Sequence, residues 1–179
     1  MTEQEKKAAR SVAGWPAYPG MMLAFALILG YVETLIPMPI GIPGIKLGLA
    51  NLAVLLTLYQ SGVRKAFLID VLRIFLSGFL FGSLYGILYS LAGGLLSFLV
   101  MAAAKKLRCF GISGVSMAGG VFHNVGQIAM AAFVVETRGL YYYLPPLLIA
   151  GVITGFLNGT LGGQILSRIP GPYYRKKGF

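Results

Sequence analysis

Three neighbouring polar side chains stand out in an otherwise apolar stretch: His123, Asn124 and Gln127. His123 and Gln127 are four residues apart and share one face of a helix, with Asn124 one step round it. All three can donate and accept hydrogen bonds. At mid-depth in a membrane helix they are expected to line a site for the polar head of a ligand. The alternative is hydrogen bonding between helices, which contributes about 1 kcal/mol per bond in membranes.

A second group of candidate residues surrounds the segment 37–51, PMPIGIPGIKLGLAN. Its prolines and glycines interrupt helical structure, so we expect one helix to end before it and another to begin near Ile45. Free backbone N–H groups at a helix start attract negative charge. The expected counter-charge near Lys46 is Glu33 or an anionic ligand, and Asn51 is expected to face the same cavity. Alternatively, Lys46 extends its charge to a lipid headgroup.

Asp70 and Arg73 form a third pair of candidates, because residues three apart are neighbours on a helix surface. Charged groups inside membrane spans are rare and are usually paired or functional. The spacing predicts a structural ion pair. The alternative is contact with a partner protein or a gate.

Glycines recur at every fourth position near the end of the chain, at Gly151, Gly155, Gly159 and Gly163. On one helix face they form a ridge without side chains, which permits close approach of another backbone. The ridge predicts tight helix packing, either within the chain or against a partner subunit.

Several kinds of chemistry lack the residues that they need. Asp70 is the only aspartate and Cys109 the only cysteine, so neither an aspartate-rich metal–diphosphate motif nor a multi-cysteine metal site is present. A phosphate-binding GxxxxGK[ST] loop is absent as well. We therefore predict no catalytic residues, no metal and no cofactor, and any transport must draw its energy from partner proteins.

Composition indicates an integral membrane protein. Of 179 residues, 57% are hydrophobic and 11% are charged. In soluble domains the charged share is about 25%. The net charge of +10 arises from basic residues that flank apolar runs, as topology signals do, instead of lining one polar face. We therefore expect membrane lipids and no nucleic acid among the partners.

The apolar runs predict an all-α protein with six transmembrane helices and both termini in the cytoplasm. All but three of the 15 Lys and Arg residues then lie on the inner side, the exceptions being Lys46, Arg73 and Arg138. Residues 1–18 are expected to form a cytoplasmic segment, 19–167 the transmembrane domain and 168–179 a basic cytoplasmic tail. The predicted helices are Pro19–Ile36, Ile45–Gln60, two within Ala66–Ala104 joined by a turn near Gly82–Gly86, Val115–Val135 and Leu144–Leu166.

Four sequence blocks, PGIKLGLAN, DVLRIFLSGFLFG, SLAGGLLSFLVM and GVSMAGGVFHNVGQ, resemble a bacterial membrane family. The family is called the Gx transporter family or heptaprenyl diphosphate synthase component I, and the resemblance covers roughly Gly30 to Gly163. It implies a location in the bacterial cytoplasmic membrane and a relation to the S components of energy-coupling-factor (ECF) transporters. Those relatives are six-helix bundles with a ligand cavity open to the outside, and they assemble with a transmembrane coupling subunit and two ATPases.

Three functions are consistent with these patterns. The first is an S-component-like subunit that captures an anionic or amphipathic small molecule from the outer side. The second is a membrane accessory protein of isoprenoid and quinone metabolism or of flavin-linked electron transfer. The third, a prenyl-transferring enzyme component, requires aspartate motifs that the sequence lacks.

Overall fold

The computed structural model describes residues 17–35 and 47–169, and all regular structure within them is helical. The prediction of an all-α protein is thereby confirmed for this part of the chain. The elements are α2 (Ala17–Leu35), α3 (Leu49–Gln60), α4 (Val63–Phe81), α5 (Leu84–Leu107), α6 (Ile112–Val135), the 3-10 helix η1 (Arg138–Tyr143) and α7 (Leu144–Arg168).

Four stretches are long and apolar enough to cross a membrane: α2, α5, α6 and the continuous stretch Gly139–Arg168 that contains α7. The 24 residues of α5 span about 36 Å at about 1.5 Å per residue, more than the ~30 Å hydrocarbon layer. Large apolar side chains such as Phe79, Phe133 and Ile149 are exposed on the surface. These are the features of a multi-pass membrane protein.

The remaining two helices differ from a simple span. The helix α3 has 12 residues, which corresponds to a length of about 18 Å. The helix α4 carries Arg64, Lys65, Asp70 and Arg73. Every residue of α3 from Leu52 to Gln60 is buried. α3 therefore belongs to the core of the bundle, and the six-span topology with cytoplasmic termini stays a prediction.

Helix boundaries follow the glycines and serines of the connecting segments. The predicted turn near Gly82–Gly86 is confirmed, because α4 ends at Phe81 and the Ser83 hydroxyl accepts a hydrogen bond from the Gly86 N–H at 3.1 Å to begin α5. The predicted start of α3 near Ile45 is wrong, because α3 begins at Leu49. Gly48 lies immediately before α3 with a φ of 68°, a left-handed conformation that cannot continue a right-handed helix.

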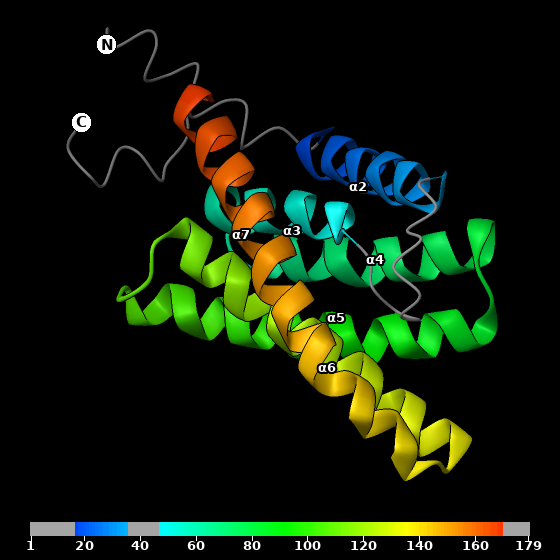
Figure 1. Ribbon diagram of the computed structural model, residues 1–179. Coiled ribbons are helices and arrows are strands. Elements are labelled where there is room, and N and C mark those ends of the chain that lie inside the picture. Colours follow the sequence, from blue (N-terminus) through cyan, green and yellow to red (C-terminus); the bar gives the residue numbers. More distant parts are fainter. Residues whose placement is uncertain (1–16, 36–46, 170–179) are drawn as a thin grey trace, which may run out of the picture.

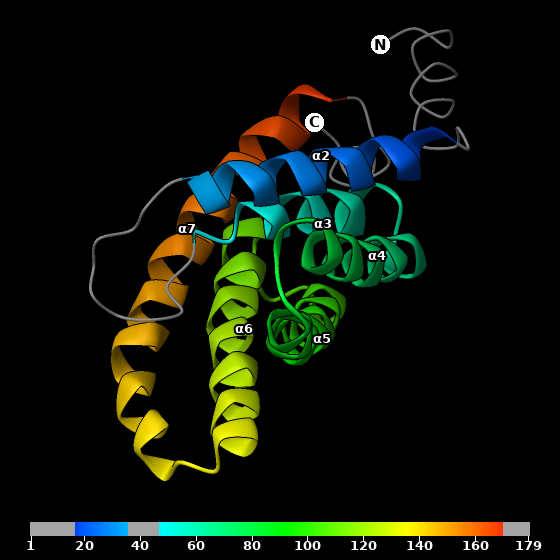
Figure 2. The same cartoon turned by 90° about the vertical axis from the view of Figure 1, so that its right-hand side faces the viewer.

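The helices form two groups, α2 to α4 and α5 to α7, which meet where α3 packs against the second group. α6 packs against both α5 and α7, and η1 joins it to α7 at one end of the pair (Figure 2). α3 contacts α2, α4 and α7, and α4 runs beside α5 (Figure 1). The main core cluster of Leu55, Leu58, Phe98, Val115 and Leu166 joins α3, α5, α6 and α7. The two groups thus share one interior.

The glycine ridge of α7 faces α6. A Cβ atom on Gly155 would lie 2.6 Å from the Met117 Cα atom, and one on Gly159 would lie 2.5 Å from the Ser113 Cα atom. At Gly151 the nearest atom would be the Gly120 carbonyl oxygen at 2.8 Å, whereas at Gly163 it would be the Ile112 Cδ1 atom at 4.0 Å. The first three glycines therefore set the close approach of the two helices, and Gly163 lies outside it.

Candidate ligand-binding cavity

A cavity of about 220 Å³ lies in the middle of the bundle, with wall residues from all six α-helices α2 to α7. All three asparagines of the chain and its single histidine are on this wall. The predicted ligand residues that the structure describes are thus brought together at one place. The polar wall residues discussed below are Glu33, Asn51, Arg73, Ser97, His123, Asn124, Gln127 and Asn158.

Glu33 caps the beginning of α3. Its Oε1 atom accepts a hydrogen bond from the Gly48 N–H at 2.6 Å. A carboxylate in this place also interacts favourably with the helix dipole, by about 0.3–1 kcal/mol. The sequence predicted either Glu33 or an anionic ligand as the counter-charge at this helix start, and Glu33 lies there. Lys46 lies outside the described residues.

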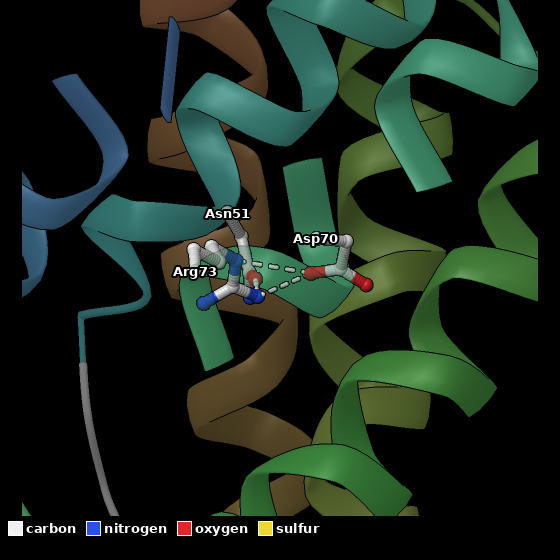
Figure 3. A network of polar contacts seen from close by, with 3 residues as sticks. All are labelled: Asn51, Asp70 and Arg73. Atoms are coloured by element: carbon white, nitrogen blue, oxygen red, sulfur yellow. Dashed lines mark hydrogen bonds and ion pairs between the residues drawn. The ribbon is translucent and has the colours of Figure 1, made fainter. Parts of the chain in front are cut away.

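Arg73 is the centre of a buried polar network that also holds Asn51 and Asp70 (Figure 3). Its Nε and Nη2 atoms donate to Asp70 Oδ1 at 2.9 and 2.6 Å, and Nη2 also donates to Asn51 Oδ1 at 2.6 Å. Asp70 is only 2% exposed and Arg73 only 9%. Buried charges of this kind need such partners, so the predicted ion pair between these α4 residues is present, and its role in the fold stays a prediction. Arg73 also lies on the cavity wall, where Nη1 donates to none of the described residues.

Asn51 and the Asp70–Arg73 pair are separate features in the sequence, and the structure joins them. Asn51 orients the guanidinium through its oxygen, which leaves its amide nitrogen near Gly48. The network therefore couples the cavity wall on α3 to a buried charge on α4.

Asn158 is a wall residue that was not among the predicted site residues. Its Nδ2 atom donates to the carbonyl oxygens of Leu47 at 2.9 Å and Gly48 at 3.2 Å, which ties α7 to the residues before α3. The signal was present in the sequence, because an asparagine inside an apolar helix needs a partner or a cavity. The rule that singled out His123 and Asn124 applies equally to this residue.

The polar group of α6 has mixed roles. Asn124 donates through Nδ2 to the Leu147 carbonyl oxygen on α7 at 2.7 Å, so this donor bonds between helices. Its Oδ1 atom and the whole amide of Gln127 are not hydrogen-bonded to any of the described residues, and both residues lie on the cavity wall. The expected hydrogen bonding between helices is thus present at the Asn124 Nδ2 atom, and ligand binding by the remaining atoms stays a prediction.

The described charges around the cavity are more negative than positive. Glu33 and Asp70 carry two negative charges against the one positive charge of Arg73. Within residues 17–35 and 47–169, no three His, Cys, Asp or Glu side chains are grouped closely enough to hold a metal ion. The arrangement is suited to holding an organic molecule by hydrogen bonds.

Comparison with known proteins identifies a family. Residues 22–165 match the family model described as heptaprenyl diphosphate synthase component I. Neither a curated protein nor a solved structure matches the chain.

Proposed function

The chain belongs to the heptaprenyl diphosphate synthase component I family, and we propose that it acts as the membrane-embedded substrate-binding subunit of a small-molecule uptake transporter. It captures an anionic or amphipathic molecule from the outer side of the membrane. Partner subunits supply the energy, because the sequence has no ATP-binding loop. The resemblance to S components points to an ECF-type coupling subunit and its ATPases as those partners.

The observation that carries this proposal is a polar cavity at the centre of an apolar helical bundle. Polar side chains inside a membrane are costly and mark either packing contacts or a path for solutes. The Gln127 amide and the Asn124 oxygen make no hydrogen bond to any of the described residues, so helix packing does not account for them. Hydrogen-bonding groups left open on the wall of an internal cavity are what a ligand site requires.

Native mass spectrometry of the protein purified in mild detergent tests the proposal. We expect the parent protein to carry a bound small molecule and Gln127→Leu to lose most of it, because an unpaired polar group on a buried ligand costs about 1–3 kcal/mol. Gln164→Leu is the matched control, since Gln164 is exposed on α7 and lines neither this cavity nor the one beside it. Equal occupancy in all three proteins, or none in any, would remove the basis of the proposal.

A second candidate function is an accessory role in isoprenoid and quinone metabolism or in flavin-linked electron transfer. The observation in its favour is the family description, which names a synthase component. The only aspartate, Asp70, is bound to Arg73, so prenyl-transfer chemistry would belong to a partner. Co-purification with a soluble prenyl synthase whose activity falls when this protein is removed would favour the accessory role.

A further inference from the structure

A second, lateral cavity of about 430 Å³ borders the central cavity. The two share four wall residues, Gly86, Ser90, Asn124 and Gln127. The lateral cavity lies between the first turns of α5, the second half of α6, and the region where η1 meets α7. The rest of its wall is formed by Tyr89, Ile128, Ala131, Leu140, Tyr143 and Leu147.

The boundary between the two cavities is formed by small or polar residues. Gly86 and Ser90 on α5 face Asn124 and Gln127 on α6. The Asn124 amide nitrogen is held by the Leu147 carbonyl at 2.7 Å, and this bond fixes the side chain at the boundary. On one side of it the wall is rich in hydrogen-bonding groups, and on the other it is almost entirely aliphatic and aromatic.

Size supports joint use of the two spaces. Sites for small molecules and cofactors usually measure about 300–1,000 Å³. The central cavity, at about 220 Å³, is below that range by itself. By itself the central cavity has room for only a compact group, so a larger molecule would have to extend beyond it, and the lateral cavity lies next to it.

The charges that the described residues bring to the central cavity do not favour a strongly anionic group there. Arg73 is already paired with Asp70 and donates three hydrogen bonds to Asp70 and Asn51, so only its Nη1 atom is left to donate on this wall. Among the described residues, the charge of Arg73 faces the two carboxylates of Glu33 and Asp70. A diphosphate would find no excess of positive charge in this part of the chain.

A buried hydroxyl provides an independent sign that the central cavity takes a hydrogen-bonding group. Ser97 lies on its wall, is only 2% exposed, and its Oγ atom has no hydrogen-bond partner among the described residues. Leaving a buried polar atom without a partner is costly. A bound molecule with a carbonyl, hydroxyl or amide group would satisfy it.

We propose that the two cavities together hold one amphipathic molecule, whose uncharged or zwitterionic hydrogen-bonding head occupies the central cavity and whose apolar part occupies the lateral cavity. This rests on the proposed function, because it names the class of molecule that the same site binds. Gln127 and Asn124 contact it where its polar and apolar parts join.

The test compares three substitutions on α6 with the parent protein. Ala131→Trp fills the lateral cavity, and Ala129→Trp is its matched control, because Ala129 is exposed and lines neither cavity. Gln127→Leu removes the hydrogen-bonding groups at the boundary. Each protein is analysed by native mass spectrometry, and whatever molecule remains bound is released and fragmented. The same proteins are melted with and without an organic extract of the source membranes.

We expect a bound molecule with a ring or chain of carbon joined to a polar group that lacks a diphosphate. Ala131→Trp and Gln127→Leu should each reduce its occupancy about tenfold, while Ala129→Trp keeps occupancy within about twofold of the parent. Should Ala131→Trp fail to fold, Ala131→Leu makes the same comparison with a smaller side chain.

A bound molecule that is wholly polar, or that carries a diphosphate, overturns this inference and leaves the proposed function intact. So does occupancy that Gln127→Leu abolishes and Ala131→Trp leaves unchanged. No bound molecule together with no melting shift on adding the extract, or only phospholipid held equally by all four proteins, overturns both proposals.

Discussion

The buried Asp70–Arg73 pair shows how single residues control the stability of this bundle. Asp70 is 2% exposed, so the substitution Arg73→Met leaves its carboxylate without the groups that compensate its burial. Removing one partner of a buried pair costs about 3–5 kcal/mol. We expect Arg73→Met to lower the folded yield and the melting temperature strongly, as measured by size-exclusion chromatography and thermal melting in detergent.

The double variant Asp70→Leu/Arg73→Met is the control, because it removes both charges and leaves apolar groups. It should recover much of the stability that the single variant loses. If Arg73→Met melts like the parent, the carboxylate does not depend on the guanidinium and the network of Figure 3 contributes little to folding.

Glu33 gives a graded prediction at the start of α3. Glu33→Gln keeps a side-chain oxygen for the Gly48 N–H but removes the charge, which costs about 0.3–1 kcal/mol. Glu33→Ala removes the charge-assisted hydrogen bond as well, which raises the loss to about 1.5–3 kcal/mol. The expected order of melting temperatures is parent, Glu33→Gln, Glu33→Ala.

Glu136→Gln is the control for these variants, because Glu136 is exposed at the end of α6, where a negative charge is not favoured by the dipole. Its melting temperature should equal the parent's or exceed it slightly. Identical melting of both Glu33 variants and the parent would show that the carboxylate does not stabilise α3.

At the scale of elements, glycines of α7 set how closely α6 and α7 approach each other. Gly155 has no space for a side chain, whereas Gly163 has. Gly155→Ala adds a methyl group 2.6 Å from the Met117 Cα atom and 2.7 Å from the Ser116 carbonyl oxygen, so the backbones must move apart. Overpacking of this kind costs about 1–3 kcal/mol. We expect a lower melting temperature and a lower folded yield in detergent.

Gly163→Ala is the matched control on the same helix, because its new methyl group would lie 4.0 Å from the nearest atom, Ile112 Cδ1. Alanine is favoured over glycine within a helix by about 1 kcal/mol, so this variant should melt at or above the parent. A Gly155→Ala protein as stable as Gly163→Ala would contradict the close packing.

The sequence allowed the helices to be predicted better than the contacts between them. Apolar runs bounded by glycine, proline and charged residues located α5, α6 and α7 to within a few residues, because those signals act locally. The start of α3 was misplaced because it depends on the left-handed Gly48 and on Asn158, which bonds to Gly48 from 110 positions away. A contact over such a separation leaves no pattern in the local sequence.

The same limit applies to the cavity. Polar residues in an apolar stretch identified His123, Asn124 and Gln127, and the predicted helix start near Lys46 identified Glu33 and Asn51. The structure places all five on the wall of one cavity. Ser97 and the lateral cavity were beyond prediction, since a buried serine is common and an apolar pocket has no distinctive sequence. Ligand binding by these residues stays a prediction.

At the scale of the whole molecule, the distribution of basic residues predicts how the bundle is oriented. On a Cys109→Ser background, which removes the exposed native thiol, single cysteines are placed at the exposed positions Thr137, Arg64 and Arg168. An impermeant thiol reagent should label Thr137→Cys in intact cells and the other two only after permeabilisation. External labelling of Arg64→Cys would contradict the predicted topology.

The pairing of α6 with α7 has a consequence for how the chain enters the membrane during synthesis. α6 carries the polar residues His123, Asn124 and Gln127. Its Gly120 packs against Gly151 of α7, and Asn124 bonds to the Leu147 carbonyl oxygen of α7. We expect α6 to be a poor substrate for the insertion machinery alone and to insert efficiently as a hairpin with α7. Glycosylation mapping of α6 with and without α7 measures this, and equal insertion in both cases would show that α6 needs no companion. If α6 inserts only together with α7, a nascent chain must complete α7 before the cavity wall on α6 is fixed in place.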